Sequence, residues 1–228
     1  LVRMDDQLKV QPDLAKSWEI LDSGKLYRFH LRDDIRFHKD ACFGKDSSRA
    51  LKANDVLYSL NRLRDPNLAA PGAWVLNNVA DIKVISDEIL EIHLKEAFAP
   101  FLGILSMKYC SIIPKEAVDH YGSEFSQHPV GTGPYKYQLW LENEKLVLRR
   151  NPLYFKFDED GQRLPYLKAV AVDFISDKQS AFLEFLKGNL DFLSGLDASY
   201  KDELLDAEGK LQPKYKERFE LYRQAYLN

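Results

Sequence analysis

The sequence predicts an α/β protein with mixed α+β sheets, and three observations support this class. Residues 25–32 and 135–150 alternate apolar and polar side chains, as half-buried hairpin strands do. Residues 53–64 instead repeat apolar side chains at helical spacing. Residues 170–193 have the pattern of a strand, a helix and a second strand, a unit that is expected to be parallel and right-handed.

Composition and charge narrow the class of protein. The 228 residues are 45% hydrophobic and 29% charged, which is ordinary for a globular protein of one large or two modest domains. The formal net charge is −3, and the sequence shows neither a basic stripe nor interleaved arginines and aromatics, so we expect no nucleic-acid partner. It also contains no apolar run of roughly 18 residues and no charged-then-apolar leader, and therefore predicts no membrane span.

The elements expected in the first half follow from periodicity and from start and stop signals. They are a hairpin of residues 17–20 and 25–32, a helix over 53–64 ended by Asp65-Pro66, strands at 82–85 and 89–94, a short buried helix within 100–107, and a helix from Pro114 to Gly122. Residues 1–4 show neither a helix nor a strand opening. Because the chain starts without an initiator and stops just after a patterned segment, we expect a fragment of a longer protein.

The second half is predicted to begin with a hairpin of residues 135–140 and 145–150. Further along we expect a strand at 170–174, a helix capped by Asp177 and ended by Gly188, a strand at 190–193, a short helix at 202–207 and an edge strand at 215–226.

Between the halves lies Pro129-Val130-Gly131-Thr132-Gly133-Pro134-Tyr135, which has the composition of a joint. Glycine at 131 and 133 would allow φ values closed to other residues, and the prolines restrict the approach and the exit. A phosphate-binding loop would need a following helix, whereas an alternating, strand-like segment follows here. We therefore interpret Gly131, Thr132 and Gly133 as a hinge at a domain crossing.

The two cysteines, Cys42 and Cys110, leave two alternatives open. They could close one disulfide in an oxidising compartment, or they could be two buried thiols. Their separation matches neither a redox motif nor a zinc site, so we expect no metal there.

No motif specifies catalysis or a metal. The five histidines include no pair at i, i+4 and no HExxH, which favours surface or edge positions, and no serine lies in a GxSxG elbow. We therefore predict no metal, no cofactor and no enzymatic activity. Trp74 and Tyr109 lie in loops flanked by apolar residues, which suits either the wall of a binding cleft or local packing of the loops.

Several segments, taken together, resemble the family 5 extracellular solute-binding proteins of ABC transporters, the group that binds peptides, dipeptides and nickel. The matching segments keep the family's order over most of residues 12 to 193. They are Pro12 to Glu19, Tyr27 to Asp33 with Phe37-His38, Ala53 to Val56 with Tyr58 to Leu60 and Arg62, Pro100 to Leu102, Ile113 to Ala117, Pro129 to Tyr135, Arg150 to Pro152 with Tyr154, and Gly188 to Asp191.

The resemblance implies part of the large lobe of a type II periplasmic binding protein. Residues 1–37 and 130–228 would belong to that lobe, and residues 38–129 would form a small inserted α+β domain. The family usually has threonine where Lys52 stands, so we expect the helix start at Ala53 to be less well held. The polar insert of residues 39–49 is also longer than the family's usual turn. Members are roughly twice this length, so a second lobe would be missing.

The implied function is capture of peptides or a related small solute in the periplasm, or outside the cell, and delivery to an ABC permease. Trp74, Tyr109 and Cys110 resemble positions that face the cleft in some members. Because members of the family enclose their ligand between two lobes, one lobe alone should bind it poorly. We expect a monomer, with any membrane association through a lipid anchor beyond this sequence. A ligand-sensing domain of a regulator and an enzyme with an unrecognised site are the alternatives.

Overall fold

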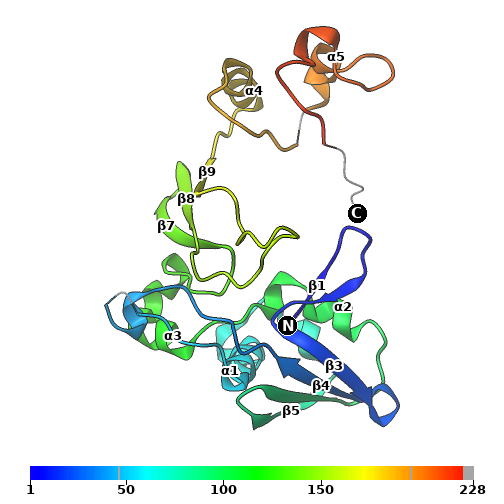
Figure 1. The fold of residues 1–228 in the computed structure, drawn as a ribbon, viewed down its shortest axis with the longest axis vertical. Coiled ribbons are helices and arrows are strands. Elements are labelled where there is room, and N and C mark those ends of the chain that lie inside the picture. Colours follow the sequence, from blue (N-terminus) through cyan, green and yellow to red (C-terminus); the bar gives the residue numbers. More distant parts are fainter. Residues whose placement is uncertain (46, 196, 223–228) are drawn as a thin grey trace. The chain divides into compact units, whose positions relative to one another are not determined.

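The structure, a computed structural model, describes residues 1–45, 47–195 and 197–222. The chain divides into two compact units, Leu1–Val172 and Asp173–Asn228 (Figure 1). Each unit has its own buried apolar cluster, and each is considered separately below.

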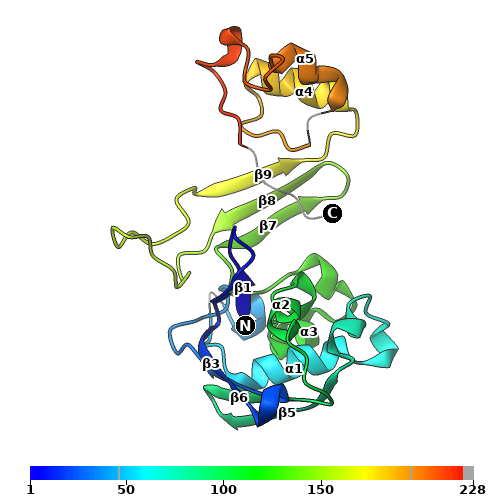
Figure 2. The ribbon, with the colours of Figure 1, turned by 90° about the vertical axis from the view of Figure 1, so that its right-hand side faces the viewer.

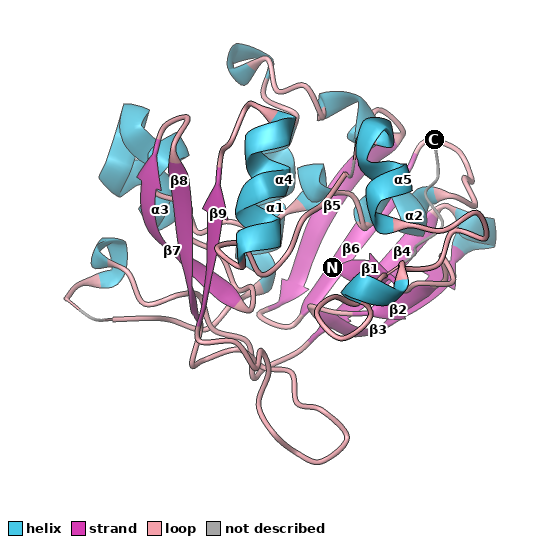
Figure 3. Ribbon diagram, turned by 90° about the horizontal axis from the view of Figure 1, so that it is seen from above, coloured by secondary structure: helices cyan, strands magenta, loops and turns pink. Residues whose placement is uncertain are grey.

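Three sheets build the first unit (Figure 3). In the first sheet, β1 (Val2–Met4) pairs with β2 (Val10–Pro12). The second is antiparallel, in the order β3 (Ala15–Leu21), β4 (Leu26–Leu31), β6 (Ile89–Leu94) and β5 (Val79–Ser86). The third has the order β7 (Tyr135–Leu141), β8 (Lys145–Arg150) and β9 (Ala169–Asp173).

In the described residues of this unit, three α-helices and several 3₁₀ turns accompany the sheets. The helices are α1 (Ala53–Leu63), α2 (Phe101–Leu105) and α3 (Lys115–Tyr121), and α1 packs against β5 (Figure 2). The 3₁₀ turns are η1 (Asp22–Gly24), η2 (Ala41–Phe43), η3 (Pro66–Leu68), η4 (Ala73–Leu76), η5 (Lys108–Cys110) and η6 (Gly122–Gln127).

The alternation along β4 explains how the core forms. Tyr27, Phe29 and Leu31 point inward and are almost fully buried, whereas the side chains between them are half-buried. Val56 and Leu60 of α1 enter the same apolar cluster. Removal of this apolar surface from water is the main favourable contribution to the stability of the fold.

The predicted segments 1–37 and 38–129 share this core. Strand β4, from the first segment, pairs along its length with β6, from the second. Val130, Tyr154 and Phe155 join the same cluster. Both segments therefore lie in one compact unit, and the assignment of 1–37, 38–129 and 130–228 to lobes of a larger protein stays a prediction.

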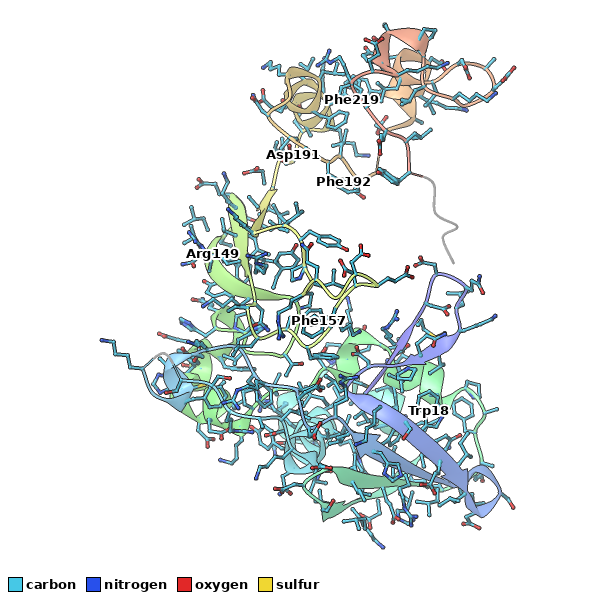
Figure 4. All side chains as sticks on the ribbon, viewed as in Figure 1. Trp18, Arg149, Phe157, Asp191, Phe192 and Phe219 are labelled. Atoms are coloured by element: carbon cyan, nitrogen blue, oxygen red, sulfur yellow. The ribbon has the colours of Figure 1, made fainter. Side chains whose placement is uncertain are left out.

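The second unit is small. Its elements are α4 (Lys178–Lys187), η7 (Ala198–Tyr200), α5 (Lys201–Leu204) and η8 (Pro213–Tyr215). Phe182, Leu204 and Tyr215 form its buried centre. Phe219, which is labelled in Figure 4, stacks on Phe185 with ring centroids 4.5 Å apart.

Most expected elements are confirmed. Both predicted hairpins, the strands at 82–85 and 89–94, the short helices at 100–107 and 202–207, and the helices beginning at 53, near 114 and after Asp177 are present, some with shifted ends. Asp177 accepts a hydrogen bond from the Ser180 N–H, and Gly188 ends α4 with φ of 84°. That left-handed value is the reason a glycine serves well there.

Three expectations about elements are wrong. Residues 190–193 form no strand, so the strand-helix-strand unit is absent, and Phe192 is 72% exposed. The stretch expected as an edge strand begins in η8 and continues without strand structure to residue 222, while 223–226 lie outside the described residues. Residues 2–4 form a strand because β2 supplies a pairing partner that the local pattern does not reveal.

The start of α1 is better held than the sequence suggests. The Lys52 side chain provides no cap, as expected, and its Nζ pairs with Asp87 instead. The Asp55 carboxylate, however, accepts the Lys52 N–H at 2.8 Å, and the Asp87 carbonyl accepts the Ala53 N–H at 2.8 Å. These two bonds satisfy the N–H groups of Lys52 and Ala53, whereas a threonine side chain at position 52 would accept from an N–H later in the first turn.

Candidate ligand-binding site

Trp74 and Tyr109 belong to two loops that meet at Gly72. Gly72 lies against the base of the Tyr109 side chain, since an added Cβ would be 2.4 Å from Tyr109 Cγ and 2.6 Å from Tyr109 Cβ. Gly72 has φ of −90°, so the space beside the ring, and not an unusual backbone conformation, requires glycine here. The loops of η4 and η5 are therefore fixed against each other.

The two aromatic side chains differ in exposure. Turn η4 buries Val75 and Leu76 and leaves the Trp74 indole 52% exposed. Tyr109 is half-buried, and the Lys108 ammonium lies 5.9 Å from its ring centroid. An exposed indole next to a fixed phenol is suited to stacking against an organic ligand.

Cys110 is placed differently from its neighbour Tyr109. It is 5% exposed, belongs to the core cluster, and its Sγ lies 3.8 Å from the Ile104 carbonyl oxygen. Burial raises the pKa of the Cys110 thiol to about 11, so the group is a neutral thiol at physiological pH. As a ligand contact, Cys110 stays a prediction that its burial does not favour.

In the structure Cys42 and Cys110 are not bridged, with Cys110 buried and Cys42 half-buried, and a disulfide between them stays a prediction. Cys42 lies half-buried in η2, where burial and then the Asp40 carboxylate raise its pKa to about 12. Neither thiol is activated as a nucleophile, because nucleophilic cysteines have a lowered pKa.

The segment 129–135 is held in place by a histidine. The His38 N–H donates to the Gly131 carbonyl at 2.7 Å, and its ring Nε2 donates to the Gly133 carbonyl at 3.0 Å. The Gly131 N–H donates in turn to His38 Nδ1 at 3.3 Å. Because a carbonyl can only accept, these contacts assign the neutral tautomer with hydrogen on Nε2.

Asn151 holds the same segment from the other side. It is 1% exposed, its side-chain amide donates to the Gly133 carbonyl at 2.9 Å, and its backbone N–H donates to the Pro134 carbonyl at 2.8 Å. We call His38, Asn151 and the backbone of 131–134 the clasp. A hinge at Gly131, Thr132 and Gly133 stays a prediction, and any such motion would have to break the clasp.

The clasp corrects two expectations. Neither Gly131 nor Gly133 has a positive φ, so the expectation of a backbone conformation reserved for glycine is wrong. His38 is 7% exposed and therefore not a surface histidine. The sequence analysis did not predict that His38 and Asn151 contact the joint. The only signal was that both residues lie in segments that resemble the family.

The part of the chain that the structure describes contains no group of side chains suited to bind a metal ion. Within residues 1–45, 47–195 and 197–222, no three histidine, cysteine, aspartate or glutamate side chains are grouped so that they could hold an ion. In the same ranges, no helix has both the length and the apolar character needed to cross a bilayer.

Comparison with known proteins identifies the family. The sequence model for bacterial extracellular solute-binding proteins, family 5 Middle, matches residues 9–228. The chain belongs to this family, and its fold is that of the type II periplasmic binding proteins.

Among curated relatives, the probable ABC transporter periplasmic-binding protein SapA of Escherichia coli is 29% identical over 218 residues, covering 87% of this chain and 38% of SapA. The glutathione-binding protein GsiB of Salmonella typhi is 27% identical, with 84% of this chain and 35% of GsiB covered. The chain thus spans less than two fifths of the length of these relatives.

Solved structures of periplasmic binding proteins superpose on this chain. The periplasmic binding protein DppA of Helicobacter pylori, in complex with the peptide STSA, superposes with a TM-score of 0.80 at 28% identity, covering 90% of this chain and 42% of DppA. NikZ of Campylobacter jejuni, in complex with Ni(L-His), superposes with a TM-score of 0.70 at 26% identity, with 84% and 36% covered.

Proposed function

We propose that this chain is part of the substrate-binding component of an ABC import system. The component captures a peptide or a related small solute in the periplasm, or outside the cell, and delivers it to a membrane permease. It binds without catalysis, acts as a monomer, and any membrane association is through a lipid anchor outside this sequence. The match to the family over residues 9–228 is the observation that carries this proposal.

The neighbours support a peptide-like solute. One solved relative holds a peptide, and curated relatives are described as glutathione-binding and as di/tripeptide-binding proteins. Ligands of this kind are small and polar, and they can be recognised through backbone hydrogen bonds, water and aromatic contact without a unique side-chain code. The exposed Trp74 and the fixed Tyr109 would supply the aromatic contact from this part of the protein.

Mass spectrometry of solutes released from the full-length protein on denaturation tests the proposal first. We expect a short peptide or related solute in a ratio near one per chain. Calorimetry should then show that Trp74→Ala weakens binding of that solute about tenfold, since loss of one aromatic contact removes of the order of 1 to 2 kcal/mol.

Trp140→Ala on β7 is the matched control, because this indole is 45% exposed and lies outside the two loops. If both substitutions weaken solute binding equally, Trp74 is not part of the binding site. Turnover of the released solute by the purified protein would instead favour an enzyme and would contradict the proposed function.

A further inference from the structure

A polar cavity of about 160 Å³ lies within the first unit, beside the clasp. Its wall combines the loop before η2, the end of η6 and the beginning of β7. The lining residues are His38, Lys39, Asp40, His128, Pro129, Val130, Lys136, Tyr137 and Gln138. None of these residues belongs to the loops of Trp74 and Tyr109, so the cavity is distinct from the candidate ligand-binding site.

Two side chains in the wall, His38 and Asp40, already form hydrogen bonds within the protein. Both ring nitrogens of His38 are used by the clasp. Oδ1 of Asp40 accepts from the Cys42 N–H at 2.9 Å and from the Tyr121 hydroxyl at 2.8 Å. These bonds hold the Asp40 carboxylate against η2 and α3, which leaves less of its acceptor capacity for a bound cation.

The aromatic part of the wall is also fixed. The His128 ring stacks on the Tyr121 ring, with centroids 4.2 Å apart and planes 5° from parallel. Tyr137 meets the His128 ring edge-on at 6.3 Å. The imidazole of His128 is therefore held in one orientation at the cavity before any ligand binds.

The remaining polar side chains are donors without partners. Among the described residues, the side chains of Lys39, Lys136 and Gln138 make no hydrogen bond or ion pair, and the hydroxyl of Tyr137 makes no hydrogen bond. Lys136 is half-buried, and its positive charge is one of the causes, after burial, that lower the pKa of His38, while the bond to Gly133 and the charge of Asp40 act in the opposite direction. Lys39 and Lys136 thus bring two positive charges to the wall of the cavity, against the single carboxylate of Asp40.

We propose that this cavity binds a small oxyanion group, a carboxylate, phosphate or sulfate. Lys39 and Lys136 supply the charge, and Tyr137 and Gln138 supply neutral donors. Hydrogen bonds between ammonium groups and oxyanions are about twice as strong as neutral ones, and the bond from half-buried Lys136 is screened less than the bond from exposed Lys39. The site is separate from solute capture between lobes, and it does not depend on which solute the family function involves.

Equilibrium dialysis of the full-length protein against radiolabelled phosphate tests the proposal. Ionic strength is kept constant with sodium chloride, so that general screening does not change during the titration. We expect saturable binding of one phosphate per chain at this site. Competition by unlabelled sulfate and by acetate identifies which oxyanion the cavity prefers.

Substitutions assign the binding to the cavity. Lys136→Gln and Lys39→Gln should each weaken phosphate binding about tenfold, the usual effect of losing one charge-assisted hydrogen bond. Lys16→Gln is the matched control, because it removes the same charge from an exposed position on β3 outside the cavity. Unchanged circular dichroism and melting temperature show that each variant is folded.

Two outcomes would overturn the proposal. One is the absence of saturable binding of phosphate, sulfate and acetate by the folded wild-type protein. The other is binding that Lys136→Gln and Lys16→Gln reduce equally, which would indicate a general charge effect. Failure of either kind leaves the proposed solute capture untouched, because that is measured with the released solute and with Trp74→Ala.

Discussion

At the scale of single residues, a few polar side chains that are buried or half-buried determine how neighbouring segments are held. His38 uses its backbone N–H and both ring nitrogens on the backbone of Gly131 and Gly133. Arg49 donates to Asp55 at 2.7 and 2.8 Å and to Glu116 at 2.6 Å, and its guanidinium lies 5.0 Å from the Phe37 ring centroid. Such side chains connect segments that are distant in sequence.

Loss of the His38 ring should destabilise the first unit. His38→Ala removes two side-chain hydrogen bonds and leaves the Gly131 N–H without its acceptor, so we expect a loss of about 2 kcal/mol in the free energy of unfolding. Urea denaturation of the protein measures this loss. His30→Ala is the control, since His30 makes only a solvent-accessible pair with Glu19 and should cost less than about 1 kcal/mol.

The same histidine should make stability depend on pH. Burial, the largest cause, lowers the pKa of His38 below its ordinary value of 6.5, so the unfolded chain binds a proton more readily than the folded one. The contribution of His38 is therefore complete above pH 6.5 and is lost as the pH falls through the lowered value. The stability difference between wild type and His38→Gln should shrink on acidification, and a difference that grows would contradict the assignment.

At the scale of elements, the starts of α1 and α4 and the contact between two loops each have an identifiable cause. The α4 helix is capped by its own Asp177, whereas α1 relies on Asp55 and on the carbonyl of Asp87. The loops η4 and η5 meet because Gly72 has no side chain.

Restoring a side-chain cap should stabilise α1. Lys52 has the extended backbone of an N-cap residue, with φ of −130° and ψ of 163°, and threonine in this conformation can accept from the first helical turn. We expect Lys52→Thr to raise the free energy of unfolding by about 0.5 to 1 kcal/mol. The exposed pair of Lys52 with Asp87 that it removes is worth little. Lys52→Ala, which also loses the pair but adds no cap, should show no gain.

Adding a side chain at Gly72 should separate the two aromatic loops. Gly72→Ala places a methyl group 2.4 Å from Tyr109, so the loops must shift, at a cost of about 1 to 3 kcal/mol. Binding of the released solute by the full-length protein should weaken as well. Gly103→Ala is the control, because its nearest neighbour, Met4, is 3.9 Å from the added Cβ; preserved solute binding by Gly72→Ala would exclude these loops from the site.

At the scale of the whole molecule, the two units differ in how much core they contain. Among the residues that the structure describes, the first has 28 residues in its buried apolar cluster, and the second has three. A unit of 56 residues, Asp173–Asn228, with so small a core falls near the size below which a domain is only marginally stable alone.

Separate expression should reveal this difference. We expect residues 1–172 alone to keep the circular dichroism and the cooperative melting of a folded unit, and residues 173–228 alone to lack a cooperative transition. Cooperative melting of residues 173–228 alone would contradict this expectation. It would show that the stacking of Phe182 on Tyr200 and of Phe185 on Phe219 is enough for this unit to fold by itself.

The sequence by itself determined the strands and helices whose periodicity is local, as in β4 and α1, and it determined the family through several short segments kept in order. Only the tertiary structure decided which side chains are buried and what they contact. It placed His38 in the clasp, turned Cys110 into the core, and left residues 190–193 without a strand partner. The physical reason is that burial and strand pairing depend on residues far away along the chain, whereas periodicity depends only on near neighbours.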